Sequence, residues 1–172
     1  MYACPSSWKK NIIKLTAPWP TYIGGGAHAG IDIACGGNTT DRAIACEDAF
    51  ILDIIEGSKS ISGTVILDGL ESGYQIKYKH QGDFQIKAGD TIEGGVVLST
   101  PNRTNTDSLH IHFEVWDEDK NLDPLRYLLD TQPNLRFDWL SSDPESESNK
   151  TAKYYKKNYP EIYRELLDRR VG

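Results

Sequence analysis

The chain has 172 residues, of which 38% are hydrophobic and 26% charged, so it can form one folded core and is too apolar for a disordered chain. Its net charge of −6 argues against a nucleic-acid-binding or anionic-membrane-binding protein, because both need a surplus of Lys and Arg. No apolar run approaches the roughly 20 residues that span a bilayer, and we expect no secretory signal at the N-terminus of this chain.

The first two thirds of the chain predict short strands. We expect residues 1–24 to be a lead-in with little regular structure, because they are rich in Pro and Gly. Residues 25–135 are the expected main domain, where β-branched or alternating runs are separated by Gly, Asn, Asp and Ser. Strands this short favour a mainly β fold, as a small antiparallel sandwich or an open barrel. The runs are residues 31–34, 43–55, 64–67, 74–79, 96–99 and 111–116.

The last third predicts helices. Asp123 can cap a helix that has Pro at its first position, so we expect a short helix over residues 123–130. Residues 141–149 are polar and linker-like. Apolar residues four positions apart then predict an amphipathic helix within 150–170. The C-terminal extension, residues 136–172, could regulate a binding site, dock on a partner or extend the core, and we favour packing on the core.

Three cysteines, Cys4, Cys35 and Cys46, are too few for a scaffold built from disulfides. No CxxC pair is present, which argues against a cysteine zinc site or thioredoxin-like chemistry. A bridge between Cys35 and Cys46 would close a short loop, and two idle thiols are an equal alternative.

The chain has four histidines, and two of them, His110 and His112, form a His-x-His motif in a predicted strand. Side chains two residues apart in a strand share a face, with Cα atoms roughly 6–7 Å apart. Both imidazoles can therefore face one cavity, while Ile111 and Phe113 point into the core. A lone His-x-His pair is, however, more often two half-buried polar residues than a metal site.

A second motif joins His28 to Asp32, and imidazole and carboxylate are ligand types that suit zinc. Residues i and i+4 of a straight strand lie roughly 13 Å apart, so the chain must bend between them to share an ion. Gly30 is the residue where such a bend costs least. Together the two motifs favour a metal site.

These residues resemble the motifs of the lysostaphin/LytM-type zinc metallopeptidases, which cleave peptide cross-links of bacterial peptidoglycan and have the duplicated hybrid motif fold. HAGID at 28–32 is similar to the family's H-x-G-x-D element, and HIHFEV at 110–115 to its H-x-H-F-E element. YKH at 78–80 is similar to the Y-x-H element between them. Two further stretches, 88–98 and 123–125, also resemble the family.

The resemblance implies an antiparallel β-fold with a groove, a Zn²⁺ ion at its floor and hydrolase activity on peptidoglycan cross-links in the periplasm or outside the cell. It implies that His28, Asp32 and His112 are the zinc ligands. It further implies that His110 is the general base and that His80 holds or polarises the water and the developing oxyanion. Such a ligand set leaves one coordination position open for catalysis.

Alternatives to an endopeptidase remain. A catalytically inactive LytM-like domain would bind and activate a partner cell-wall hydrolase, and a carboxypeptidase would trim stem peptides. A metal-binding or structural β domain without a cell-wall role predicts that His80 lies far from the other three histidines.

Some residues depart from the family or keep two interpretations. Glu114 shares the strand face of His112, and it either supports that histidine or is a solvated sheet carboxylate. Residues 100–109 lack the glycines usual before His-x-His, which leaves substrate selectivity open. Gln81 stands where the family often has Leu.

Overall fold

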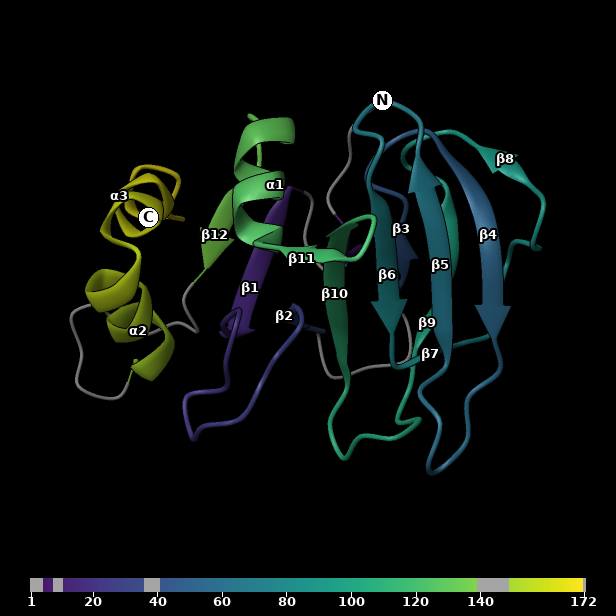
Figure 1. Ribbon diagram of the computed structural model, residues 1–172, viewed down its shortest axis with the longest axis horizontal. Coiled ribbons are helices and arrows are strands. Elements are labelled where there is room, and N and C mark those ends of the chain that lie inside the picture. The colour runs from purple at the N-terminus through teal and green to yellow at the C-terminus, as the bar shows by residue number, and fades with distance from the viewer. Residues whose placement is uncertain (1–4, 8–10, 36–40, 139–148, 172) are drawn as a thin grey trace.

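The computed structural model describes residues 5–7, 11–35, 41–138 and 149–171 (Figure 1). Its main layer is a nine-stranded sheet in the order β12-β1-β2-β10-β6-β5-β4-β8, with β11 attached to β10. A second, three-stranded sheet has the order β3-β9-β7. The mainly β fold is therefore confirmed. The elements are β1 (Ile12–Ala17), β2 (Ile31–Ala34), β3 (Ala43–Ile44), β4 (Ala49–Ile55), β5 (Thr64–Gly69), β6 (Gln75–Lys79), β7 (Gln81–Gly82), β8 (Thr91–Ile92), β9 (Val97–Pro101), β10 (His110–Asp117), β11 (Lys120–Leu122), α1 (Pro124–Thr131), β12 (Arg136–Asp138), α2 (Lys150–Asn158) and α3 (Pro160–Asp168).

The pairs of the main sheet are antiparallel except at one end, where β1 runs parallel to β12. Strand β1 lies inside the lead-in, so the expectation of little regular structure there was wrong. The side chains of β1 alternate in burial as a strand requires, because Ile13 and Leu15 are buried while Lys14 is half-buried. This short pattern was missed in the sequence because the Pro and Gly residues that follow β1 dominate the composition of the segment.

The run at 43–55 was predicted as one strand, but it forms two. β3 belongs to the small sheet and β4 to the main sheet, as their labels in Figure 1 allow the reader to follow. Buried Ala45, Cys46 and Glu47 lie in the connection. A continuous apolar run cannot by itself reveal such a change of sheet, because the run does not show where one strand ends and the next begins.

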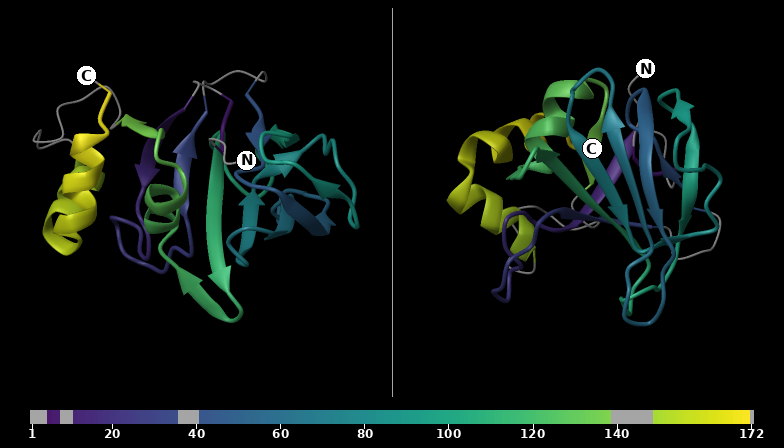
Figure 2. Two further views of the ribbon diagram at one scale, coloured as in Figure 1. Left: turned by 90° about the horizontal axis from the view of Figure 1, so that it is seen from above. Right: turned by 45° about the vertical axis from the view of Figure 1, so that its right-hand side comes forward.

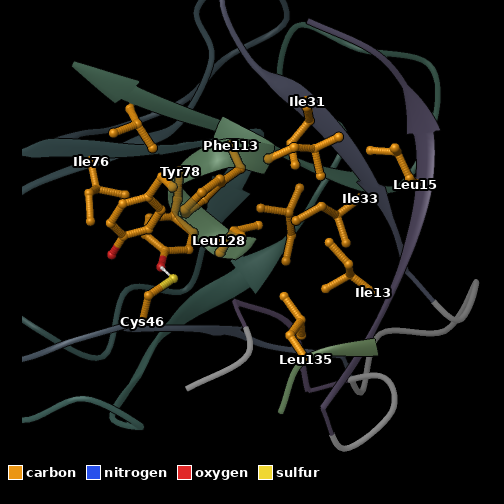
Figure 3. Packing of buried hydrophobic residues seen from close by; sticks show 14 of the residues in the cluster. Ile13, Leu15, Ile31, Ile33, Cys46, Ile76, Tyr78, Phe113, Leu128 and Leu135 are labelled. Carbon is orange, nitrogen blue, oxygen red and sulfur yellow. Dashed lines mark hydrogen bonds between the residues drawn. The ribbon is translucent and has the colours of Figure 1, made fainter. Parts of the chain in front are cut away.

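The core lies against one face of the main sheet, where α1 contributes Leu128 (Figure 3). The small sheet contributes Ala43 and Leu98 to the same core. Ile111 and Phe113 are fully buried, as predicted. The Cys46 sulfur lies 2.9 Å from the Tyr78 hydroxyl, which also donates to the carbonyl of Ile44. Cys35 and Cys46 are both thiols, so the disulfide alternative is wrong.

Helix α1 begins as predicted, because the Asp123 side chain accepts a hydrogen bond from the backbone N–H of Leu125. The C-terminal extension packs at the β1–β12 end of the sheet (Figures 1 and 2), where Tyr155 and Leu166 are fully buried. It forms two helices rather than one, since Pro160 cannot continue the hydrogen-bond pattern of α2 and instead starts α3. The expected linker lies, apart from its last residue, outside the described residues.

Within the described part of the chain, no helix combines the length and the apolar character needed to cross a bilayer.

Candidate functional site

Three neighbouring strands align Asp32, His112 and Lys79 across the main sheet. In the register of β2, β10 and β6, the Cα of His112 pairs with Asp32 on one side and with Lys79 on the other. By strand alternation, all three side chains lie on the face opposite the core. Loops that follow β1, β4 and β9 extend at one end of this sheet, the lower edge in Figure 1.

His28 reaches this row because the chain bends just before β2, as the sequence predicted. The backbone N–H of His28 donates to the carbonyl of Pro20 at 2.9 Å, and the bend follows at Ala29 and Gly30. A Cβ atom on Gly30 would collide with the carbonyl of Phe113 and lie 2.9 Å from Nε2 of His112. Close approach of the strands, rather than an unusual backbone angle, is therefore what requires glycine.

Three donor atoms converge at this point. His28 Nε2 lies 3.2 Å from Asp32 Oδ1 and 3.1 Å from His112 Nδ1, and His112 Nδ1 lies 2.9 Å from Asp32 Oδ1. Ligand atoms about 2.0 Å from a tetrahedral zinc ion are about 3.3 Å from one another. The spacing of the three atoms thus fits a single zinc ion.

The outer nitrogens of the two rings support the same conclusion. His28 Nδ1 lies 2.6 Å from the carbonyl oxygen of Pro18, and His112 Nε2 lies 3.0 Å from Glu114 Oε1. Carbonyl and carboxylate oxygens accept only, so these ring nitrogens carry the protons. The lone pairs of His28 Nε2 and His112 Nδ1 then face each other and the carboxylate of Asp32, an arrangement that a cation stabilises.

Glu114 is almost completely buried, so its interpretation as a solvated carboxylate was wrong. Besides the proton of His112, it accepts hydrogen bonds from Lys79 Nζ at 2.5 Å and from Trp116 Nε1 at 2.7 Å. Burial alone would raise the pKa of Glu114, but the hydrogen bonds from His112 and Lys79 outweigh it and lower the pKa to about 2. The side chain therefore stays ionised behind the His112 ring.

Asp32 is ionised for a similar reason. Burial favours its neutral form, yet the His112 and His28 rings that contact it and the nearby His110 favour the anion and hold its pKa well below the usual range. Burial also disfavours the charged form of His112, but the carboxylates of Asp32 and Glu114 beside its two ring nitrogens favour that form and raise its pKa. The cluster thus contains two stable anions beside the imidazoles.

His110 and His80 lie side by side next to the cluster, with ring centroids 4.6 Å apart. His110 Nε2 is 3.6 Å from Asp32 Oδ1, and His80 Nδ1 donates to the carbonyl of Thr104 at 2.8 Å. Burial lowers the pKa of both imidazoles, which favours their neutral forms. The prediction of the structural-domain alternative, that His80 lies far from the other histidines, was wrong.

The backbone of His80 has a φ of 63°, in the left-handed region that is costly for a residue with a side chain. Consecutive residues of a straight strand face opposite sides, but this turn at the end of β6 lets Lys79 and His80 line the same cavity. Gln81, the departure from Leu, is buried, and its amide contacts the Ser99 hydroxyl and the Lys79 carbonyl. A polar residue is tolerated there because its amide oxygen and nitrogen both have partners.

Asp32 and three of the four histidines, His80, His110 and His112, border an open cavity of about 460 Å³, and the buried His28 lies directly behind Asp32 and His112. Polar residues such as Ser62, Asn105 and Ser108 also line the cavity. Tyr22 also lines it and stacks on His28 with ring centroids 4.0 Å apart. Sequence reasoning missed Tyr22 at the cavity, because no spacing rule links it to the two motifs. It likewise missed Lys79.

These observations define a mainly β protein with a candidate His/Asp metal centre at the floor of an open cavity. The pattern that describes peptidase family M23 matches residues 26–124. The chain therefore belongs to peptidase family M23.

Similar proteins include both an enzyme and an activator. Glycyl-glycine endopeptidase ALE-1 of Staphylococcus capitis is 28% identical over 159 residues, which are 87% of this chain and 42% of ALE-1. Murein hydrolase activator NlpD of Escherichia coli K12 is 27% identical over 103 residues, which are 60% of this chain and 26% of NlpD. The chain thus spans less than half the length of either relative.

Lysostaphin from Staphylococcus simulans has a solved structure that superposes with a TM-score of 0.62. The match covers 76% of this chain and 54% of lysostaphin at 18% sequence identity. At this identity the likeness shows a shared fold.

Proposed function

We propose that this protein is a zinc-dependent endopeptidase that hydrolyses peptide cross-links of bacterial peptidoglycan, in the periplasm or outside the cell. The observation that carries this proposal is the meeting of four imidazoles and one aspartate in one cluster, of which three imidazoles and the aspartate border a single open cavity. Membership of family M23 and the similarity to ALE-1 support it.

His28, Asp32 and His112 would hold the zinc ion. Two imidazoles and one carboxylate suit this ion, and their donor atoms have the spacing described above. Bound zinc would supply a Lewis acid that polarises a peptide carbonyl and makes a nearby water more acidic. The Pro18 carbonyl and Glu114 orient the two rings and keep their lone pairs directed inward.

His110 is the proposed general base, because its Nε2 lies beside Asp32 and a buried imidazole of lowered pKa is neutral near pH 7. It would accept the proton of the attacking water and return it to the leaving amine. His80 donates through Nδ1 to Thr104, so its Nε2 can accept a hydrogen bond from that water.

A second candidate is a non-catalytic domain that activates a partner cell-wall hydrolase, and the similarity to NlpD favours it. Catalysis remains the better proposal, because the chain has a residue in each of the five positions that the chemistry needs.

The deciding experiment incubates the zinc-loaded chain with purified peptidoglycan and analyses the released fragments by mass. We expect about one zinc per chain, newly exposed amino groups at cut cross-links, and a loss of at least about 100-fold in rate for His110→Ala with its zinc retained. Removal of single terminal residues would instead indicate a carboxypeptidase. Equal results for the wild type and His110→Ala would refute catalysis, and faster digestion by an added hydrolase would then support the activator.

A further inference from the structure

Lys79 places a positive charge at the cavity, directly beside the candidate metal ligands Asp32 and His112. Its strand neighbours that of His112, and neighbouring strands lie about 4.8 Å apart. The side chain is 34% exposed, and its ammonium bonds to Glu114 Oε1 at 2.5 Å. Among the described residues that line the cavity, it is the sole Lys or Arg.

The ammonium of Lys79 has hydrogen-bond donors beyond the one that it gives to Glu114. Glu114 already accepts hydrogen bonds from His112 and Trp116, one at each carboxylate oxygen. An ammonium has three donors, and the structure gives Lys79, among the described residues, one acceptor. The remaining donors can serve a bound molecule, since Lys79 lines the cavity.

No other anion competes for Lys79 inside the cavity. Asp32 is the one carboxylate among the described lining residues, and His28 and His112 engage it. The nearby rim offers neutral side chains, among them Ser62, Asn105 and Thr106. An anionic group that enters therefore meets a local positive charge, although the chain as a whole carries −6.

We propose that Lys79 forms a carboxylate-binding subsite one residue away from the bond that is cut. The proposal rests on the proposed peptidase function and specifies its substrate class. Peptides with a free carboxylate next to the scissile bond are preferred to neutral peptides such as oligoglycine. We place the subsite one residue from the cleaved bond because the distance between neighbouring strands is similar to the length of one residue in an extended peptide.

The test uses pairs of synthetic cross-link peptides that differ in one group, a free carboxylate or its carboxamide, next to the cleaved bond. One pair carries it on the amino side and the other on the carboxyl side. For one of the pairs we expect the wild type to prefer the carboxylate form by about 10- to 100-fold in kcat/KM, as one charge-assisted hydrogen bond provides. Lys79→Gln brings the ratio close to one, and Lys79→Arg retains most of it.

Lys77→Gln is the matched control. Lys77 lies two residues earlier on the same face of β6, with its ammonium 4.6 Å from the ring centre of Trp116 and outside the cavity lining. Its removal leaves the preference unchanged. Equal cleavage of both forms by the wild type overturns the subsite. An equal loss of kcat/KM for both forms in Lys79→Gln also overturns it, because Lys79 would then act only by supporting Glu114.

Calorimetric binding of the same peptides to the zinc-loaded His110→Ala variant separates this proposal from the peptidase proposal. Tighter binding of the carboxylate form, lost in the double variant with Lys79→Gln, supports the subsite even if the wild type cleaves nothing. No difference in binding overturns the subsite, whether or not the wild type is an active peptidase.

Discussion

Nε2 of His112 lies 3.0 Å from Oε1 of Glu114, a carboxylate on the same strand that is 1% exposed. The hydrogen bond determines which ring nitrogen carries the proton and leaves Nδ1 facing His28 and Asp32. A buried carboxylate behind a histidine thus organises the candidate metal centre.

We therefore expect Glu114→Gln to weaken zinc binding by about 10- to 100-fold, because the amide supports the imidazole less well than the carboxylate does. Competition with a chromophoric chelator measures the affinity. Asp53→Asn, which changes an exposed carboxylate on β4, is the control and should bind zinc as the wild type does. Unchanged affinity in Glu114→Gln would show that Glu114 is structural only.

Zinc should stabilise the folded chain, because the convergent donor atoms exist only in the native state. At a free zinc concentration 1,000 times the Kd, the gain is about 4 kcal/mol, which corresponds to a rise in Tm of roughly 10 °C. Scanning calorimetry with zinc and after chelation measures it. Asp32→Asn should lose most of the rise, and an undiminished rise would place the ion elsewhere.

Gly30→Ala should destabilise the fold by about 1–3 kcal/mol and weaken zinc binding. Its Cβ would press on the Phe113 carbonyl and on the His112 ring, both held by the strand pairing. Gly24→Ala is the matched control, because nothing lies within 4 Å of the added atom. Urea unfolding compares the two, and similar midpoints would contradict the close approach of β2 and β10.

The stability of the chain should depend on the protonation of Asp123. Burial raises the pKa of this carboxyl to about 6, above its value in the unfolded chain. The folded state therefore binds the proton more tightly, and this contribution is present below about pH 4 and lost as the pH rises through 6.

Asp123→Asn should accordingly be about 1–3 kcal/mol more stable than the wild type at pH 7.5 and nearly equal to it at pH 4. The amide oxygen can still accept the hydrogen bond from Leu125 that caps α1. Urea unfolding at the two pH values measures the difference. Exposed Asp119→Asn should show no such change, and a lower stability of Asp123→Asn at pH 7.5 would reverse the inferred sign.

The C-terminal helices should be part of the cooperative fold. Leu166→Ala removes a fully buried side chain of α3 and should cost about 2–5 kcal/mol. Leu70→Ala, at a side chain that is 58% exposed, should change stability by less than about 1 kcal/mol. If Leu166→Ala unfolds like the wild type, the helices are an independent appendage.

Local sequence patterns were sufficient to predict much of the candidate site. Strand alternation places His110 and His112 on one face and Phe113 in the core, and the need for a bend at Gly30 follows from the distance between His28 and Asp32. The cap at Asp123 is equally local. Such features depend on residues a few positions apart, so the sequence by itself determined them.

Only the tertiary structure decided the rest, because it depends on strand order and register. The pairing of β10 with β2 brings His28 and His112 together across 84 positions of the chain, and the pairing with β6 places Lys79 beside them. The same pairings bury Glu114. No local pattern contains this information, since the free energy that selects a register comes from burying one whole face of the sheet.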